Sequence, residues 1–293
     1  MAQTREIKKR IVAVGTIQRI TKTMQMIATA KFTAAAQRAK ATKPYTGTIR
    51  RLVGELAGAA EEIEHPLIDG PAEPVRRELL LVIGSDRGLC GAYNASVFRT
   101  ANRHIGDLRQ AGIALDLETS GKKAVGFFRF QKIDIDQRHF IGDKPVYEEV
   151  EQIAARFIDA FAAGQYDAVR VAYMRFESNS RQVPEVLQLL PIKPEEAGEA
   201  AGKDHQPHAN YEFSPSSEAL FADLLPLAVK AQLFQAFNDA VVSEQLMRMV
   251  AMKAATENAK DLGKLLHRQF NRARQTQITT ELSEIIGGTA ALE

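Results

Sequence analysis

The residues best suited to chemistry in this chain lie in one glycine-bounded turn at 84–91, Gly-Ser-Asp-Arg-Gly-Leu-Cys-Gly. The turn follows an apolar run of strand length and precedes residues with helical periodicity, the position that phosphate-binding loops occupy. However, its sequence matches neither GxGxxG nor GxxxxGK[ST], and no lysine stands at the start of the following helix. We therefore interpret it as a tight strand-to-helix turn and not as a phosphate site.

Three side chains of this turn, Asp86, Arg87 and Cys90, are of types that take part in catalysis. No histidine or second carboxylate stands beside them in the sequence to complete an acid–base or nucleophilic set. Cys90 is the single cysteine, which excludes an intrachain disulfide, and we expect it to be a small buried residue. The six histidines form no cluster with metal-ligand spacing, so we expect no metal, no cofactor and no catalytic residue.

The turn lies within a segment, 75–192, that is predicted to form an α/β domain. Glu78–Gly84 is a continuous apolar run, typical of a strand buried on both faces of a parallel sheet. The alternation of strands and helices indicates a mainly parallel, Rossmann-like sheet. Further strands are predicted at 114–118, 133–135, 166–175 and 183–190, the last antiparallel, and helices at 95–108, 122–130 and 146–162. The following residues, 193–217, are rich in Pro, Gly and acids and predict a flexible loop.

The two ends of the chain, 1–60 and 218–293, are each predicted to form one very long helix. Apolar residues recur there at steps of three and four, as in Ile7, Ile11, Val14, Ile17, Ile20, Met24 and Ile27, and again in Leu262, Leu265 and Leu266. At about 1.5 Å per residue, each helix would span roughly 80–90 Å, so the helices must pair with each other or lie against a partner. Pro226 predicts a break or kink at Leu225–Pro226. The apolar C-terminal end that begins at Ile285 and Ile286 suits insertion into an apolar sleeve on a partner.

Charge is distributed very unevenly along the chain. Residues 1–50 carry eleven Lys and Arg and one acid, Glu6, a net charge of +10; because the whole chain has +2, the remainder carries −8. A basic, acid-poor helix can bind nucleic acid, lie on an anionic membrane, act as a transit peptide or face an acidic protein partner. No apolar run reaches 18 residues and no secretory signal is evident, so a reducing cytoplasmic compartment is expected.

Several motifs, in order along the whole chain, resemble those of one family, the γ subunits of F-type ATP synthases. The motifs are 19–28 (RITKTMQMIA), 85–91 (SDRGLCG), 248–258 (RMVAMKAATEN), 271–275 (NRARQ) and 278–288 (ITTELSEIIGG). Thr289 stands where the family signature usually has alanine. The chain also lacks the cysteine pair of the chloroplast members, which indicates a bacterial type.

The resemblance implies a fold of the class α/β with long helices. In this fold the N- and C-terminal helices form an antiparallel coiled coil, and the central residues form the Rossmann-like α/β domain. It implies a non-catalytic central-stalk rotor subunit in a ring of α and β subunits, next to an ε subunit and a c-ring. Such a subunit would contact the membrane only through the complex, at the cytoplasmic face of the plasma membrane. Contacts with the ring are implied for Met24, Arg248, Arg274, Gln275 and Thr279, with Ile285 and Ile286 at the tip.

From this pairing we expect Ile11–Ile20 to lie beside Leu265–Leu282, and the C-terminal helix to project past the N-terminus. Two alternatives belong to other classes of protein. The first is an α/β nucleotide-binding enzyme, but this sequence has neither a phosphate-binding loop nor an acid–base set of residues. A nucleic-acid-binding coiled coil would use the basic N-terminal helix, but only Phe32 and Tyr45 supply aromatics in residues 1–50, so no nucleic-acid partner is expected.

Overall fold

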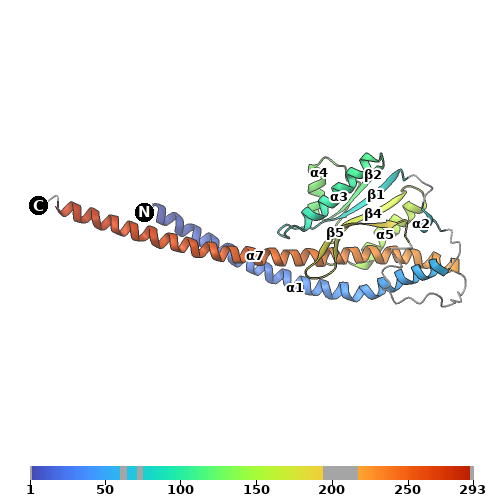
Figure 1. The fold of residues 1–293 in the computed structure, drawn as a ribbon, viewed down its shortest axis with the longest axis horizontal. Coiled ribbons are helices and arrows are strands. Elements are labelled where there is room, and N and C mark those ends of the chain that lie inside the picture. Colours follow the sequence, from blue (N-terminus) through green and yellow to red (C-terminus); the bar gives the residue numbers. More distant parts are fainter. Residues whose placement is uncertain (1, 60–64, 71–74, 194–216, 291–293) are drawn as a thin grey trace. The chain divides into compact units, whose positions relative to one another are not determined.

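The structure is a computed structural model that describes residues 2–59, 65–70, 75–193 and 217–290. It divides into two compact units: unit 1 comprises Met1–Ala30 and Arg248–Glu293, and unit 2 comprises Lys31–Met247. Two long helices, α1 (Ala2–Ala59) and α7 (Ser217–Ala290), contribute to both units (Figure 1). Residues 194–216 of the predicted loop at 193–217 lie outside the described residues.

Unit 2 contains a five-stranded sheet with the strand order β3-β2-β1-β4-β5. Neighbouring strands are parallel except for β4 and β5, which pair antiparallel as predicted. The elements between the long helices are α2 (Pro66–Asp69), β1 (Arg77–Ile83), α3 (Tyr93–Gln110), β2 (Ala114–Ser120), α4 (Lys122–Phe130), β3 (Gln137–His139), α5 (Tyr147–Ala162), β4 (Ala168–Phe176) and β5 (Gln182–Leu190). The predicted strand at 133–135 is wrong: Ile133 and Ile135 pack against the core as part of the connection, and the strand is three residues long at 137–139.

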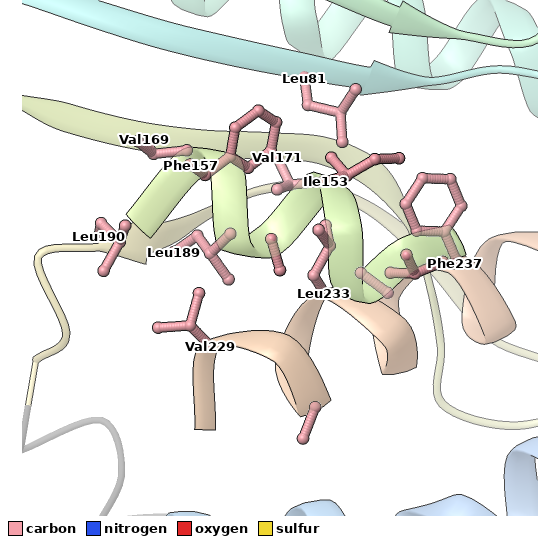
Figure 2. Close-up of a cluster of buried hydrophobic side chains, with 14 of the residues drawn as sticks. Leu81, Ile153, Phe157, Val169, Val171, Leu189, Leu190, Val229, Leu233 and Phe237 are labelled. Atoms are coloured by element: carbon pink, nitrogen blue, oxygen red, sulfur yellow. The ribbon is translucent and has the colours of Figure 1, made fainter. Parts of the chain in front are cut away.

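The central strand β1 sends alternate side chains to two separate cores, which is why its sequence is continuously apolar. On one face, Leu80 and Val82 pack against α3 and α4. On the other face, Leu81 packs with α5 and with the part of α7 in unit 2, as Figure 2 shows around Phe157 and Leu233. Helices therefore cover both faces of the sheet, and α7 is one of its covering helices.

α1 and α7 also pair with each other within unit 2. Ala35 and Ala39 of α1 form a small cluster with Val242 of α7. One turn further, the Thr42 hydroxyl donates a hydrogen bond to Gln235 Oε1 at 3.0 Å. Residues 220–287 of α7 include a stretch that is long and apolar enough to cross a membrane by length and composition. About 39% of that stretch is buried, and in unit 2 α7 packs against the sheet and α1.

The helix is not broken at Leu225–Pro226, because α7 starts at Ser217 and continues through Pro226; a kink there, the other expectation, stays a prediction. Proline fixes φ near −65°, a helical value, so its main defect is the missing N–H that would bond to the carbonyl four residues earlier. That residue, Ala222, is exposed, so we expect water to reach its carbonyl. Phe221, Leu225 and Val229 are buried in the core and hold the helix on both sides of the proline.

Unit 1 consists of α1 and α7 paired antiparallel. Thr21 and Thr256 share a hydrogen bond of 2.9 Å, and Thr4 donates to Gln277 Oε1 at 3.1 Å. α7 continues past this last contact and beyond the N-terminal end of α1, as predicted (Figure 1). The predicted register was off by about three turns: Ile11 and Gln18 share a groove with residues 259–268, which overlap the predicted partner range 265–282 only at its start. The longer projection of α7 explains the shift, since α7 continues to Ala290, beyond the hydrogen bond that joins Gln277 to Thr4 near the start of α1.

Candidate functional site

In open α/β sheets, ligands bind beyond the carboxyl ends of the parallel strands. In unit 2 this edge is filled by α7, whose Phe237, Val241 and Glu244 line it together with the residues that follow β1 and β2. The remaining cavity has a volume of about 20 Å³, whereas pockets that bind small-molecule ligands measure about 300–1,000 Å³. The described structure therefore leaves no room for a nucleotide at this edge.

The turn at 84–91 has a structural task at the same edge. Asp86 Oδ1 accepts a hydrogen bond of 3.0 Å from the backbone N–H of Lys122, and the Ser85 carbonyl accepts one from Lys123, so the turn caps the N-terminus of α4. Gly121 has φ 92°, and a Cβ there would lie 2.3 Å from the Gly84 carbonyl oxygen. The glycine is thus required by the close approach of two backbones.

Cys90 is buried, as expected. Its Sγ lies 3.3 Å from Asn94 Nδ2, which donates to it, and 3.8 Å from the Ser85 hydroxyl. Asn94 also binds the Ser85 hydroxyl and backbone N–H, so these three residues form one polar knot at the start of α3. The knot fixes the turn onto the helix, and neither Asn94 nor Ser85 is a base that could activate the Cys90 sulfur.

Two buried carboxylates pair with histidines, but both are occupied by further charges. Glu118 accepts from His139 at 2.7 Å and from both terminal nitrogens of Arg156 at 2.7 and 2.6 Å. Burial by itself would raise the pKa of Glu118, but these hydrogen bonds outweigh it and hold the pKa below its ordinary value. Glu78 pairs with His104 and, through a single ionic contact of 3.3 Å from Nε, with Arg170. Within the described ranges, no group of three His, Cys, Asp or Glu residues is placed to hold a metal ion.

The functional candidate is therefore unit 1, whose seam follows a heptad pattern. The less exposed residues alternate at steps of three and four, as expected for helices that form a left-handed coiled coil. On α1 they are Thr4, Ile7, Ile11, Val14, Gln18, Thr21, Gln25 and Ala28, and on α7 Met252, Thr256, Ala259, Gly263, Leu266, Phe270, Ala273 and Gln277. Small and polar residues occupy much of this seam, so less apolar area is buried than in a seam of leucines.

One side of the seam is apolar. We call it the apolar flank: among the residues one position before the seam residues, it comprises Ile17, Ile20, Met24 and Ile27 on α1 with Leu262 and Leu265 on α7. Toward the N-terminal end of α1 the same positions hold Glu6, Arg10 and, on α7, Arg272. In an antiparallel coiled coil these positions of the two helices lie on the same side. Apart from the half-buried Met24, the side chains of the apolar flank are 43–53% exposed. The sequence analysis counted them as part of the pairing period; the structure places them outside the seam.

The opposite side of the seam is basic. The basic flank consists of the residues one position after the seam residues, with Arg5, Lys8, Arg19 and Lys22 on α1 and Lys253, Lys260, Lys264, His267 and Arg274 on α7. Glu257 is the one acid at these positions between residues 5 and 29 and between residues 253 and 278. The coiled coil of unit 1 therefore presents different chemistry on its two sides.

The structure separates the predicted contact residues into two groups. Met24 and Arg248 lie toward the end of unit 1 where α1 reaches Ala30; Met24 is half-buried and Arg248 is 8% exposed. Arg274, Gln275 and Thr279 are exposed at the other end, where the Thr279 hydroxyl donates to the Gln275 carbonyl at 3.0 Å. Ile285 and Ile286 follow on the projecting part of α7, 66% and 59% exposed.

Sequence reasoning missed two members of that projecting end. Ile278 and Leu282 are 55% and 56% exposed and lie at steps of four and three from Ile285, so they form one apolar stripe. The helical period itself is the signal that could have identified them, because no α1 residue remains to cover that face. Exposed apolar surface of this kind marks a docking site for another chain.

Comparisons with known proteins place the chain in one family. The family model described as ATP synthase matches residues 3–292. An ATP synthase gamma chain of Rhodopirellula baltica is 41% identical over 296 residues, and those of Leptospira biflexa and Haemophilus influenzae are 37% and 38% identical over 293 residues; each match covers both proteins completely.

Solved structures agree on the fold. The chain is similar to one in the mitochondrial ATP synthase of Euglena gracilis, with a TM-score of 0.66, 18% identity and coverage of 99% of this chain and 95% of that one. It is also similar to one in the central stalk and c-ring structure of Tetrahymena thermophila, with a TM-score of 0.57, 23% identity and coverage of 80% and 99%. Fold and sequence together show that the chain belongs to the family of ATP synthase gamma chains.

Proposed function

We propose that the chain is the rotor of the central stalk in an F-type ATP synthase, where it couples rotation of the c-ring to conformational change in the catalytic β subunits. The observation that carries this function is the two-sided surface of unit 1, an apolar flank and a basic flank along one coiled coil. The chain itself is a non-catalytic subunit of a membrane-associated complex.

The two-sided surface supplies what a rotor needs. A ligand shifts a conformational equilibrium only by its differential affinity for the states. A shaft with equal flanks would offer the same contacts to each surrounding subunit, whereas this one offers apolar area to one and positive charge to another. Each orientation then stabilises a different conformation in a given β subunit, with coupling energies typically of about 1–3 kcal/mol.

The partners follow from this placement. The α and β subunits surround unit 1, and the ε subunit and the c-ring lie beside unit 2, at the cytoplasmic face of the plasma membrane. Met24 and Arg248 contact the ring at one end of unit 1, and Arg274, Gln275 and Thr279 at the other. The apolar stripe that ends at Ile285 and Ile286 supports a tip seated in an apolar sleeve.

Reconstitution tests the proposal directly. Purified α and β subunits are mixed with this chain, and the assembly is isolated by affinity purification on the chain. The expected result is a stable complex with ATPase activity, while the chain alone has none and shows no tight ATP binding by calorimetry. Failure of the chain to co-purify with α and β, or micromolar ATP binding to the isolated chain, would contradict the proposal.

A further inference from the structure

Asp239 of α7 is the centre of a chain of hydrogen bonds that joins three elements of unit 2. The Thr42 hydroxyl of α1 donates to Gln235 Oε1 at 3.0 Å, and Gln235 Nε2 donates to Asp239 Oδ1 at 2.7 Å. The backbone N–H of Phe176, the last residue of β4, donates to the same carboxylate. We call this set, Thr42, Gln235, Asp239 and the Phe176 N–H, the carboxylate clasp.

The apolar packing beside the clasp is thin. α1 contributes two alanines, Ala35 and Ala39, to a small cluster with Val242 of α7. Phe32 of α1 meets the Phe176 ring edge-on, with 6.4 Å between the ring centroids. Since alanine side chains bury little apolar area, the hydrogen bonds of the clasp form a large part of the contact that holds α1 at this level.

Asp239 differs from Glu78 and Glu118, two buried carboxylates of the sheet, because it has no counter-ion. Glu78 and Glu118 each form a salt bridge with an arginine. In the described part of the chain no residue forms a salt bridge with Asp239, although it is only 4% exposed. Removing an ionised carboxylate from water without a counter-ion is costly, so a group in this position favours its protonated form.

The charged groups that face Asp239 do not neutralise it. On α1, Lys43 is exposed and lies over the aromatic ring of the clasp, 6.0 Å from the centroid. On β5, Glu185 adds a second negative charge; it accepts a 2.7 Å hydrogen bond from the Tyr173 hydroxyl of β4 and forms a 3.2 Å salt bridge with Arg175. Arg175 is thus already paired. Burial raises the pKa of Asp239 to about 6, although the hydrogen bonds of the clasp and the charge of Lys43 lower it.

We propose that the carboxylate clasp is a pH-sensitive contact, which holds α1 firmly when Asp239 is protonated and opens more readily when Asp239 is ionised. A neutral Asp239 is buried at little cost and keeps the clasp closed. An ionised Asp239 regains water when the segment of α1 around Thr42 opens, so ionisation favours the open state. Because the folded pKa is raised, the closed state is favoured fully below the ordinary value of 3.8 and loses that advantage as the pH rises through about 6.

This pH dependence is a property of the folded chain and does not require assembly with α and β subunits. It extends beyond the proposed function, which assigns no role to protons inside the chain. In the proposed rotor, the clasp would make the attachment of α1 to the α/β domain firmer as the surrounding solution becomes more acidic.

Hydrogen exchange of the full chain, followed by mass spectrometry, measures the opening. The observable is the exchange of the α1 backbone amides in residues 39–46 relative to their intrinsic rates, a ratio that removes the pH dependence of the exchange chemistry itself. If opening returns Asp239 to its ordinary pKa of 3.8, the open fraction should rise about tenfold between pH 5 and pH 7.5. Amides of α4, none of whose residues belongs to the clasp, are the internal reference and should show no such rise.

Variants of the clasp and of its neighbours identify the group that titrates. Asp239→Asn should abolish the rise and keep the segment closed over the whole pH range. Thr42→Val removes a donor of the clasp and should increase exchange at every pH without moving the midpoint of the transition.

Two charge changes should move that midpoint in opposite directions by about 0.3–0.7 pH unit. Lys43→Met should raise the midpoint, because it removes a cation that lowers the pKa of Asp239, and Glu185→Gln should lower it. A contact with a merely structural role would not respond in this way. Asp261→Asn is the matched control, since it removes an exposed carboxylate elsewhere on α7 and should leave the midpoint unchanged.

Two results would overturn the inference. A pH-dependent rise that persists in Asp239→Asn would assign the proton to another group. Midpoints of Lys43→Met and Glu185→Gln that equal the wild-type midpoint would do the same, and this comparison decides the matter even if Asp239→Asn fails to fold. Failure of the chain to co-purify with α and β subunits would leave the exchange measurements unaffected, so the proposed function and the clasp fail separately.

Discussion

Asp239 is a carboxylate on α7 that unit 2 buries to 4% exposure. Burial raises the pKa of Asp239 to about 6, and the negative charge of Glu185 contributes to the rise. A 2.7 Å hydrogen bond from Gln235 and the positive charge of Lys43 lower the pKa but do not outweigh burial. Because the folded pKa lies above the ordinary 3.8, the folded chain binds more protons than the unfolded chain between about pH 4 and pH 6. The contribution of Asp239 to the free energy of unfolding therefore falls as the pH rises through that window.

Replacing Asp239 by asparagine should remove this dependence. Asp239→Asn is expected to raise the free energy of unfolding at pH 7 by about 1–3 kcal/mol, since each pKa unit corresponds to about 1.4 kcal/mol. Urea unfolding at pH 4.5 and pH 7 measures the difference. Asp261→Asn is the control, because Asp261 is exposed and should leave the profile as it is. A variant of Asp239 with the wild-type pH slope would show that this carboxylate does not titrate in the window.

Glu118 contributes a pH dependence of the opposite sign to the free energy of unfolding. Its folded pKa is held below the ordinary value, so its stabilisation is present above the unfolded pKa and is lost as the pH falls through the folded pKa. Glu118→Gln breaks a buried pair and leaves His139 and Arg156 short of an anion. We expect a loss of about 2–3 kcal/mol at pH 7, at the low end for buried pairs because Arg156 is partly exposed. The loss of stability should shrink below pH 4. Glu149→Gln is the control, because Glu149 is exposed and its replacement should not change the free energy of unfolding measurably.

At the scale of a single element, Pro226 shows how packing keeps the long helix α7 continuous through a proline. Proline is about 3 kcal/mol less favourable than alanine in a helix interior, but water can satisfy the exposed Ala222 carbonyl here. Pro226→Ala should therefore stabilise unit 2 by about 1–3 kcal/mol, measured as a higher melting temperature. A lower melting temperature would mean that α7 needs the bend that proline imposes.

The register of unit 1 can be tested by disulfide formation. The Thr21 and Thr256 hydroxyls are 2.9 Å apart, so cysteines at these positions should oxidise readily to a bridge that survives denaturation. The native Cys90 is buried and should not interfere. Ile20→Cys with Thr256→Cys is the control pair, since Ile20 lies on the apolar flank. Equal bridging in both pairs, or bridging of Thr21→Cys with Phe270→Cys, would contradict the register.

These elements show what sequence could and could not predict. Continuous apolar residues identified β1, and periodicity identified α3, α4, α5 and both long helices, because burial on a regular element leaves a period. The three-residue β3 was missed because so short a strand leaves no pattern. The apolar flank was mistaken for the seam, because Ile17, Ile20 and Ile27 repeat at helical steps and only the pairing register shows which stripe faces α7. The basic flank needs both helices at once, so it was not predictable from either alone.

At the scale of the whole molecule, the two flanks predict that added charge has different effects on different sides. Met24→Lys places a cation on the apolar flank, where an ion pair of about 0.5–1 kcal/mol with the surrounding ring would favour one orientation over the others. The complex should assemble and hydrolyse ATP but pump fewer protons per ATP in vesicles. Met26→Lys, on the basic flank at the same level of α1, should disturb the ratio much less. Equal ratios in both variants and the wild type would contradict this role of the flanks.

The central claim is that this chain turns inside the complex, and rotation of a single labelled molecule tests it most directly. Phe130 at the end of α4 is 88% exposed, and the native cysteine is buried, so Phe130→Cys accepts a bead or rod selectively. The α and β subunits are fixed to a surface and ATP is added. We predict stepwise rotation of the label in one direction that stops when ATP is removed. ATP hydrolysis by the same molecules with a stationary or randomly fluctuating label would contradict the claim.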